Sequence, residues 1–453
     1  MKSINPATGE IIREYREYSD PEAIQIIHDV NLTWKTWKDT SFEMRSALMK
    51  NTAQVLRNNK EHYARLMTLE MGKLLRESVA EIEKCAWVCD YYADHAEEML
   101  KDEVIATDAT RSFITFQPIG VILAVMPWNF PFWQVFRFAA PALMAGNSAV
   151  LKHASNVPGC AMAIEEIFRE AGFPENLFRT LMIPSSGVEA VISNHLIAAA
   201  TLTGSEAAGS QVASLAGKFL KKTVLELGGA DPFIVLDDAD LDAAVKTAVT
   251  ARMLNQGQSC IAAKRFIVMK QVMQQFESAL KAEFEALHMG DPTDIKTQVG
   301  PMARPDLVDV IENQVRASIS SGARLVMGGR RPNRSGCYFE PTILADVCKG
   351  MPVYSQETFG PVVSLIAAED EQDAIRIAND SDFGLGGCVW TRDLERGEMI
   401  ARKVETGAMF VNGMTKSDPR LPFGGIKKSG YGRELASYGI KEFVNIKTIW
   451  IGG

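Results

Sequence analysis

The sequence of 453 residues has no strongly basic segment and no apolar run long enough to cross a bilayer. Its most apolar stretch, from Ile119 to Met126, is far shorter than the roughly 20 residues of a membrane-spanning helix. The net charge of −8 makes nucleic acid and anionic membranes poor partners. The first residues lack a basic end followed by an apolar run, so we expect no secretory signal and a cytoplasmic protein.

Cysteines are few and follow no recognisable framework. Seven of them, an odd number, are spread through a long chain, unlike the disulfide pattern of small secreted proteins. Cys85 and Cys89 lie four positions apart in a helical pattern, but no His or Cys pair completes a zinc ligand set. We therefore predict no metal site.

The hydrophobic periodicity predicts helices first and then short strands alternating with amphipathic helices. Residues 20–100 are expected to be helical, since Asp20-Pro21 and Ser41 are good helix starts. The first alternating series places strands at 119–126, 148–152, 180–183, 198–203, 223–227 and 233–236, and helices at 131–145, 157–171 and 209–219. The second places strands at 264–269, 324–327, 362–368 and 408–412, and helices at 272–287, 305–321 and 371–379. A helix is also expected at 239–254, and the tail at 443–450 is again strand-like.

Such alternation is typical of parallel, doubly wound sheets. The chain is also too long for one ordinary core, which favours two or three domains. We therefore predict an α/β protein with a Rossmann-type domain and a second α/β domain, divided near Gly228-Gly229.

Cys260 ends the polar segment Asn255-Gln-Gly-Gln-Ser-Cys260, which is expected between a helix and a strand. A cysteine in a polar, glycine-containing loop is exposed enough to react, whereas cysteines in apolar helices usually are not. An incidental loop cysteine is the alternative, because reactivity requires surroundings that favour the thiolate.

Glu226 closes an apolar strand and is followed by two glycines. A carboxylate at such a place is partly desolvated, which raises its pKa toward that of a useful general base. A solvated glutamate at a strand end is the alternative.

Asn129 lies between two prolines at an expected strand-to-helix turn. Its uncharged amide would be a fixed hydrogen-bond donor suited to an oxyanion. An ordinary turn asparagine is the alternative.

Gly204-Ser205 follows an expected strand and opens a helix. Backbone amides at such a helix start suit a pyrophosphate, although the segment is not a GxGxxG motif. A plain strand-to-helix turn is the alternative.

Together these segments resemble the aldehyde dehydrogenase superfamily nearly from end to end, in both order and spacing. The matching motifs are Asn5-Pro-Ala-Thr-Gly9, Pro127-Trp-Asn129, Lys152, Thr203-Gly204-Ser205, Glu226-Leu-Gly-Gly, Gly257-Gln-Ser-Cys260, Glu357-Thr-Phe359-Gly-Pro, Pro422-Phe-Gly-Gly and Asn445-Ile-Lys. The resemblance implies that the Cys260 thiolate attacks an aldehyde, that the Asn129 amide holds the oxyanion, and that Glu226 activates water to hydrolyse a thioester.

The resemblance also implies an NAD(P) site. Glu357 would bind the nicotinamide ribose beside Phe359, and Lys152 would hold the adenine ribose. The full set of cofactor residues implied is Trp128, Lys152, Ser155, Gly204, Ser205, Leu227, Glu357 and Phe359. Many NAD-preferring relatives carry a glutamate in place of Ser155, and its absence removes repulsion of a 2′-phosphate. We therefore expect NADP to be preferred and NAD also used, unless Ser155 is merely small and the choice is made elsewhere.

Three segments carry a closer resemblance, namely Lys152-His-Ala-Ser155-Asn, the run Leu225–Ala239, and Asn412-Gly with Ser417-Asp. Through them the chain resembles bacterial succinate-semialdehyde dehydrogenases of the short type. Trp133 and Arg137 lie four apart on an expected helix and share a face. The similarity implies that Arg137 anchors the far carboxylate of the substrate, with Ser259 and Ser417 as further donors. From spacing alone, Arg137 is equally suited to pair with an internal acid.

Two other activities are weighed against hydrolytic oxidation of this or another small aldehyde. Enzymes that pass the acyl group to CoA usually lack the base matching Glu226, and a non-catalytic protein would be expected to lose Cys260, Glu226 or Asn129. All three residues are present.

The resemblance implies a cofactor domain at 1–105 and 125–228, a catalytic domain at 229–420, and a small β oligomerisation element at 106–124 and 432–453. Such an element would add a strand to a neighbour's sheet. A homodimer or a dimer of dimers is therefore expected, with a small aldehyde as the other partner.

Overall fold

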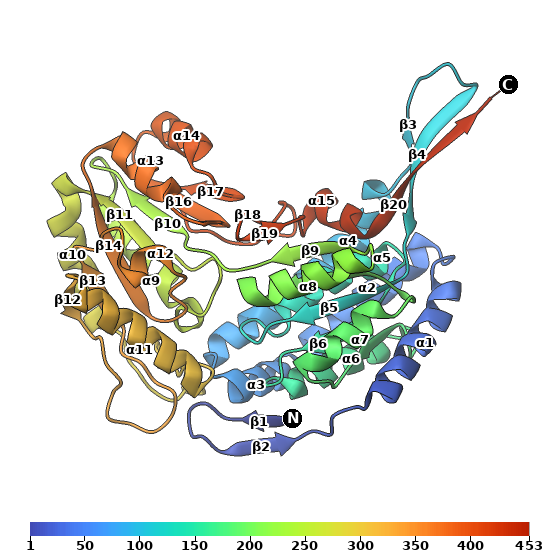
Figure 1. The fold of residues 1–453 in the computed structure, drawn as a ribbon, viewed down its shortest axis with the longest axis horizontal. Helices are drawn as coiled ribbons and strands as arrows, with labels where there is room; N and C mark the ends of the chain where they lie inside the picture. The colour runs from blue at the N-terminus through green and yellow to red at the C-terminus, as the bar shows by residue number, and fades with distance from the viewer. Residues whose placement is uncertain (453) are drawn as a thin grey trace.

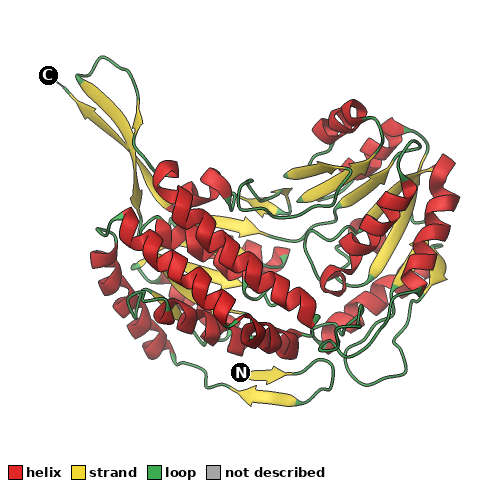
Figure 2. Cartoon of the chain, turned by 180° about the vertical axis from the view of Figure 1, so that it is seen from behind, coloured by secondary structure: helices red, strands yellow, loops and turns green. Residues whose placement is uncertain are grey.

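The computed structural model describes residues 1–452 and shows two parallel-sheet units lying side by side, with a β arm projecting from one of them (Figure 1). Figure 2 shows the same units from behind, where long helices cover the sheet that carries the arm. This arrangement confirms the predicted α/β class with two sheets.

The first unit is a six-stranded sheet in the order β19-β9-β8-β5-β6-β7, parallel except for β19. Its strands are β5 (Val121–Met126), β6 (Ser148–His153), β7 (Phe178–Thr180), β8 (Ile197–Thr203), β9 (Lys222–Glu226) and β19 (Gly430–Tyr431). Its helices are α1 (Asp20–Trp37), α2 (Phe42–Asn58), α3 (Lys60–Met71), α4 (Leu75–Met99), α5 (Trp133–Met144), α6 (Pro158–Glu170), α7 (Val188–Ser193) and α8 (Glu206–Lys218).

The second unit is a seven-stranded sheet in the order β12-β13-β14-β11-β10-β16-β17, in which only β12 is antiparallel. Its strands are β10 (Pro232–Val235), β11 (Arg265–Met269), β12 (Arg324–Met327), β13 (Thr342–Ala345), β14 (Val362–Ala368), β16 (Gly386–Trp390) and β17 (Ala408–Val411). Its helices are α9 (Leu241–Met253), α10 (Lys270–Glu285), α11 (Pro305–Ser320), α12 (Pro352–Ser355), α13 (Glu371–Asn379) and α14 (Leu394–Lys403).

The arm joins distant parts of the chain, since β20 (Val444–Ile451) pairs antiparallel along the whole of β4 (Arg111–Pro118), and β3 (Glu103–Val104) pairs with the other edge of β4. The remaining elements are β1 (Lys2–Ile4), β2 (Ile11–Glu14), β15 (Phe383–Gly384), β18 (Ile426–Lys427) and α15 (Ala436–Ile440). No helix within residues 1–452 combines the length and apolarity that a bilayer span requires.

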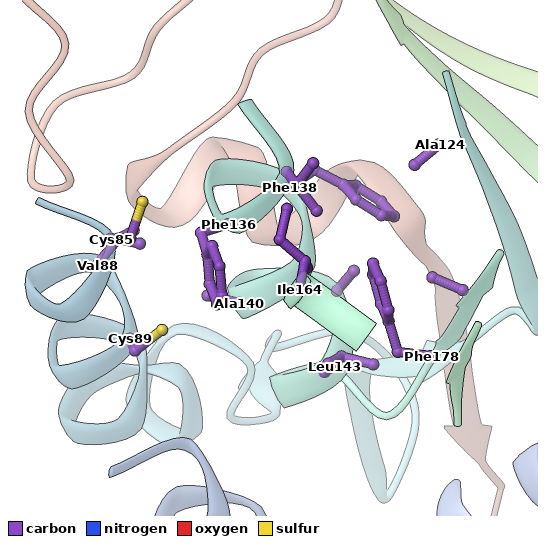
Figure 3. Close-up of a cluster of buried hydrophobic side chains, with 14 of the residues drawn as sticks. Cys85, Val88, Cys89, Ala124, Phe136, Phe138, Ala140, Leu143, Ile164 and Phe178 are labelled. Atoms are coloured by element: carbon purple, nitrogen blue, oxygen red, sulfur yellow. The ribbon is translucent and has the colours of Figure 1, made fainter. Parts of the chain in front are cut away.

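The largest core lies around α5, every residue of which is buried. Phe136 of α5 packs against Phe168 of α6 with ring centroids 5.3 Å apart, and α4 contributes Cys85 and Cys89 to the same cluster (Figure 3). Burial raises the pKa of both thiols well above the ordinary value, so these cysteines are neutral core residues.

Two sequence predictions differ from the structure. The strand expected at 180–183 lies earlier, at Phe178–Thr180. The β element expected at 106–124 is divided, because β4 ends at Pro118 and residues 121–124 belong to β5, which pairs with β6 and β8 in the first sheet. Gly120, with φ of 135°, separates the two strands and lets the chain turn from the arm into the sheet.

Candidate active site

Two cavities meet at Cys260. One of about 190 Å³ is lined by apolar, polar and charged side chains and is called the aldehyde chamber below, after the substrate that the sequence resemblance implies. The other, of about 460 Å³, opens along the ends of β6 and β8. Cys260 and Gln134 line both cavities. The half-buried thiol therefore lies where a small molecule in one cavity would touch a molecule in the other.

The loop that carries Cys260, residues 255–262, follows α9 through a strained turn. Asn255 and Gln256 have φ of 51° and 55°, and Gly257 has φ of 74°. A Cβ atom at Gly257 would lie 2.2 Å from the carbonyl oxygen of Gly360, so only glycine fits. Left-handed backbone at non-glycine residues costs about 1–3 kcal/mol each and persists only where the surroundings fix it.

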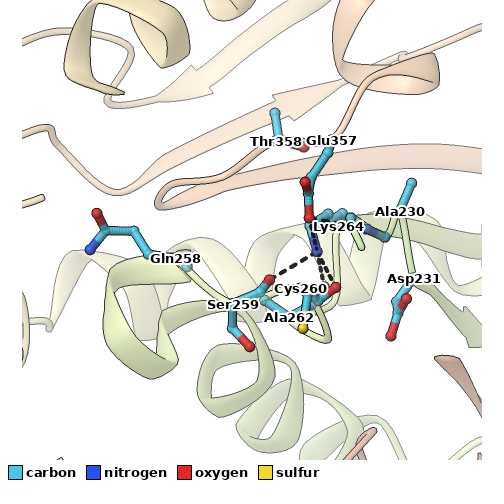
Figure 4. Close-up of polar contacts among 12 residues, drawn as sticks. Ala230, Asp231, Gln258, Ser259, Cys260, Ala262, Lys264, Glu357 and Thr358 are labelled. Atoms are coloured by element: carbon cyan, nitrogen blue, oxygen red, sulfur yellow. Dashed lines mark hydrogen bonds and ion pairs between the residues drawn. The ribbon is translucent and has the colours of Figure 1, made fainter. Parts of the chain in front are cut away.

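Two buried cations fix this Cys260 loop. Lys264 donates to three of its carbonyl oxygens, at 3.0, 2.7 and 3.2 Å (Figure 4), and these belong to Ser259, Cys260 and Ala262. Arg252 donates to the Gly257 carbonyl at 2.6 Å. Hydrogen bonds from charged donors are the stronger kind, so they hold the loop in its strained form.

The Cys260 thiol is neutral in this environment. Burial raises its pKa to about 12, although Arg137 and Lys264 act in the opposite direction. A thiolate therefore requires a base that takes the proton as the reaction begins.

Glu226 is the buried carboxyl group at the end of β9. Burial raises its pKa well above the ordinary value, and the negative charge of Glu434 raises it further. Neither carboxyl oxygen has a hydrogen-bond partner within residues 1–452. The sequence-based expectation of a desolvated acid at this strand end is confirmed, and its raised pKa makes the carboxylate a stronger proton acceptor than an ordinary glutamate.

The Asn129 side chain lies directly against the Cys260 loop. Its Nδ2 donates to the Gln258 carbonyl at 3.1 Å, and Asn255 Nδ2 donates to the Asn129 carbonyl at 2.8 Å. Cys260 N–H makes no hydrogen bond to any of the described residues. Two N–H donors, one from an amide and one from the backbone, therefore lie around the thiol.

The larger cavity brings together all eight residues predicted to bind the cofactor, namely Trp128, Lys152, Ser155, Gly204, Ser205, Leu227, Glu357 and Phe359. The Phe359 and Trp128 rings meet edge to face with centroids 5.8 Å apart. Glu357 accepts a hydrogen bond from Gly229 N–H at 3.0 Å and faces Lys264 at 3.6 Å. A Cβ at Gly228 would lie 2.6 Å from Glu357 Oε2, so glycine keeps this wall of the cavity open.

Three parts of this cavity suit an anionic ligand. Lys152 is buried, its desolvation lowers the pKa of the ammonium, and no carboxylate pairs with it within residues 1–452. Ser155 is exposed beside it. Ser205 caps α8 by accepting a hydrogen bond from Ala208 N–H at 3.3 Å, which places the N-terminus of that helix at the cavity.

All four residues predicted to bind substrate, Trp133, Arg137, Ser259 and Ser417, line the aldehyde chamber. Arg137 has an internal acidic partner, since it forms a buried ion pair with Glu434 and also donates to Thr203 Oγ1 at 3.3 Å. Spacing alone left open whether Arg137 pairs with an internal acid, and the structure shows that it does. Its role toward an aldehyde stays a prediction.

The sequence did not single out Lys84, Lys264 or Glu434, although all three lie at the site. Lys264 had a local signal, because two cations, Lys264 and Arg265, stand at the start of a fully buried strand. No local sequence signal pointed to Lys84 or Glu434, because only the tertiary fold brings α4 and the C-terminal segment to the site. Within residues 1–452, no group of three or more His, Cys, Asp or Glu side chains is arranged to hold a metal ion.

A sequence model of the aldehyde dehydrogenase family matches residues 1–449. The chain belongs to this family. This aldehyde dehydrogenase is 53% identical over 451 residues to a probable succinate-semialdehyde dehydrogenase [NADP(+)] of Synechocystis sp., covering 100% of this chain and 99% of that protein. It is 49% identical over 454 residues to the succinate-semialdehyde dehydrogenase [NADP(+)] of Mycobacterium leprae, with the same coverage.

Solved structures agree with these sequence comparisons. The succinic semialdehyde dehydrogenase of Streptococcus pyogenes, determined in complex with NADP+, superposes on this aldehyde dehydrogenase with a TM-score of 0.98. The two chains are 40% identical, and the match covers 100% of each.

Proposed function

We propose that this aldehyde dehydrogenase oxidises succinate semialdehyde to succinate, with NADP+ preferred and NAD+ also used. The observation that carries the proposal is the position of Cys260, where the aldehyde chamber meets the larger cavity. Relatives named as NADP(+)-dependent succinate-semialdehyde dehydrogenases, about half identical over the full chain, support the substrate and the cofactor.

In the first step, Cys260 Sγ attacks the aldehyde carbon while the thiol proton passes to Glu226. The carbonyl oxygen becomes an oxyanion, which Asn129 Nδ2 and Cys260 N–H stabilise. Donors fixed in a desolvated site are effective because they need no reorganisation as the charge develops. A nicotinamide cofactor, held by Glu357 and Phe359 in the larger cavity, would supply the acceptor for the hydride that leaves the carbon bonded to Cys260. Loss of that hydride would leave a thioester on Cys260.

In the second step, Glu226 first releases the thiol proton to solvent and then takes a proton from water, and the oxygen of that water attacks the thioester carbon. The C–S bond breaks, the new carboxyl group loses its proton to solvent as succinate leaves, and the Cys260 thiolate recovers a proton from Glu226. A desolvated carboxylate suits this role because burial raises its pKa and so makes it a stronger base.

The larger cavity fits NADP. Unpaired Lys152 beside Ser155 supplies positive charge without an opposing carboxylate, which favours a 2′-phosphate. Gly204 and Ser205 at the start of α8 would receive the pyrophosphate. Glu357 would receive the ribose hydroxyls next to the nicotinamide.

On the same basis, Trp133, Arg137, Ser259 and Ser417 form the walls that contact the aldehyde. The chain would divide into a cofactor part, a catalytic part and the arm. The exposed apolar side chains of the arm, Val104, Ile446, Trp450 and Ile451, suit contact with a second copy, as in a homodimer or a dimer of dimers. The cytoplasmic location expected from the sequence stays a prediction.

The decisive experiment follows reduction of NADP+ at 340 nm with succinate semialdehyde and with unsubstituted butanal, without added CoA. Sustained turnover, with a higher kcat/KM for succinate semialdehyde, is expected. Turnover that appears only with CoA would show a CoA-acylating enzyme, which the buried Glu226 argues against. Equal kcat/KM for the two aldehydes would contradict the proposed substrate.

A further inference from the structure

Lys264 is fully buried, and its ammonium group lies against the backbone of the Cys260 loop. Its Nζ donates to the carbonyl oxygens of Ser259, Cys260 and Ala262 at 3.0, 2.7 and 3.2 Å (Figure 4). An ammonium group has three N–H donors, so these three oxygens occupy all of them. Lys264 therefore has no donor left for a substrate or a cofactor, and its role lies in the loop itself.

Two of these carbonyl oxygens belong to the peptide groups on either side of the Cys260 Cα. The Ser259 carbonyl is part of the peptide before that atom, and the Cys260 carbonyl is part of the peptide after it. The Cys260 oxygen is also confined by the turn after β9, because a Cβ at Gly229 would lie 2.7 Å from it. A single ammonium therefore fixes both peptide planes, and with them the direction of the Cys260 side chain.

The Ser259–Cys260 peptide is trans, so its carbonyl and its N–H point in opposite directions. Its oxygen accepts from Lys264 and also from Ala262 N–H at 3.2 Å, whereas its N–H has no partner within residues 1–452. A cation at the carbonyl oxygen draws electron density toward that end of the peptide and makes the N–H at the other end a stronger donor. Lys264 thus both orients and polarises the N–H that faces a developing oxyanion.

Two acids near Lys264 favour its charged form. Burial lowers the pKa of the ammonium, while the negative charges of Glu357 and Asp231 raise it. Glu357 Oε1 lies 3.6 Å from Nζ. A buried cation is costly unless acids compensate it, and neutral donors would satisfy carbonyl oxygens without that cost. The charge itself therefore points to a function beyond holding the loop.

Arg252 is the second fully buried cation of this loop, but it bonds to different peptide groups. It donates to the Gly257 carbonyl at 2.6 Å and to the Ala263 carbonyl at 2.9 Å. Neither oxygen belongs to a peptide that contains an atom of Cys260. Arg252 holds the loop on either side of the nucleophile, whereas Lys264 holds it at the nucleophile, so the two cations form a matched pair.

We propose that Lys264 is a positioning residue for the oxyanion. It aligns and polarises the Ser259–Cys260 peptide, so that Cys260 N–H stabilises the negative charge that develops when the thiolate attacks a carbonyl carbon. The inference rests on the proposed function only through the roles of Cys260 and its N–H. It requires neither succinate semialdehyde nor NADP.

Two reactions of Cys260 that differ in the oxyanion provide the test. With p-nitrophenyl acetate, the thiolate attacks the carbonyl carbon, an oxyanion forms, p-nitrophenolate leaves, and water hydrolyses the acetyl thioester. With iodoacetamide, the thiolate displaces iodide from the methylene carbon, and no oxyanion forms. Both reactions need the thiolate, so the ratio of kcat/KM for ester hydrolysis to the rate constant for alkylation of Cys260 cancels a change in the thiol pKa. Lys264→Met is expected to lower this ratio at least tenfold.

Arg252→Met is the matched control, since it loosens the same loop without touching the Cys260 peptide. It should lower both rate constants together and change their ratio by less than threefold. Lys264→Arg keeps the charge and the donors and should also hold the ratio within threefold. Equal ratios in Lys264→Met and Arg252→Met would overturn the inference and make Lys264 a structural residue only.

A second neutral variant covers the case in which Lys264→Met does not fold. Lys264→Gln keeps two N–H donors without the charge and should show a ratio at least threefold below that of Lys264→Arg. Equal ratios in these two variants would likewise overturn the inference. Ester hydrolysis and alkylation proceed without aldehyde or cofactor, so a wild type with no preference for succinate semialdehyde over butanal would contradict the proposed function alone.

Discussion

The buried guanidinium of Arg137 forms an ion pair with Glu434, and the charge of Glu434 in turn raises the pKa of Glu226. The wall of the aldehyde chamber is therefore electrostatically connected to the candidate base. Arg137, Glu434 and Glu226 are all buried. Removal of one charge therefore changes the electrostatic environment of the other two, because solvent does not reach them to compensate.

Arg137→Ala is expected to lower kcat/KM at least tenfold for both succinate semialdehyde and butanal, by similar factors. The substitution leaves Glu434 buried and unpaired, which in other proteins costs about 3–5 kcal/mol and here also shifts Glu226. The double variant Arg137→Met, Glu434→Gln removes both charges and should recover part of the activity. A loss confined to succinate semialdehyde would show instead that Arg137 itself holds the carboxylate.

Cys260→Ala should abolish oxidation while leaving NADP+ binding intact, because none of the side chains proposed to bind the ribose and the pyrophosphate is changed. Glu226→Gln should form NADPH about once per site and then stall, since thioester hydrolysis lacks its base. The first turnover should also be slow, because the thiol pKa of about 12 leaves little thiolate without a proton acceptor. Rapid-quench and burst measurements distinguish these steps, and wild-type turnover of Glu226→Gln would remove it as the base.

Ser155→Glu should shift cofactor preference from NADP+ toward NAD+. A carboxylate beside Lys152 would pair with the ammonium and repel the 2′-phosphate, while it would accept hydrogen bonds from an unmodified ribose. The measurement is the ratio of kcat/KM for the two cofactors at one aldehyde concentration. Ser155→Ala is the control, because it removes the hydroxyl without adding charge, and an unchanged ratio in Ser155→Glu would place cofactor choice elsewhere.

His153 gives a pH dependence of stability. Burial lowers its pKa to about 4 from 6.5, and Nε2–H donates to the Pro131 carbonyl at 2.9 Å while Nδ1 accepts from Ala154 N–H at 2.8 Å. Below pH 6.5 the unfolded chain binds a proton that the folded chain does not. The free energy of unfolding should therefore fall between pH 6.5 and 4, by about 3 kcal/mol at roughly 1.4 kcal/mol per pKa unit.

His153→Gln tests this dependence, because glutamine does not titrate. Urea unfolding of the two proteins between pH 4.5 and 7 should show a smaller loss of stability in the variant. The raised pKa values of Glu77 and Asp231, to about 7 and about 6, act in the opposite direction but are shared by both proteins. Parallel curves for the two proteins would contradict a neutral buried histidine.

Local periodicity was enough to locate most elements of the fold. Strand β14 and helix α13 have the predicted bounds, because the apolar run of one and the capped amphipathic pattern of the other are unambiguous. Strand β16 was missed because it begins with Gly386-Gly387, and glycine is rare in strands. Strand β13 was also missed, although β12, which is equally short, was predicted with the correct bounds.

The residues of the candidate site were likewise only partly predictable from the sequence. The sequence singled out Cys260, Glu226 and Asn129, because each belongs to a short motif at the end of a strand or helix. The charged residues of the aldehyde chamber cannot be predicted from the local sequence pattern. Lys84 lies on a helix more than a hundred residues before Cys260 in the sequence, and Glu434 lies more than a hundred residues after it. Whether a buried cation already has an acid partner depends on packing between distant segments, as the Arg137 to Glu434 pair shows.

Because β19 pairs antiparallel with β9, the first sheet is completed only late in the synthesis of the chain. Synthesis begins at the N-terminus, so five strands of the first sheet emerge before β10 exists. Gly430 then pairs with Glu226, and Glu434 arrives four residues later. The candidate base Glu226 is therefore synthesised early, whereas the charged residue that sets its electrostatic surroundings is made only after the entire second sheet.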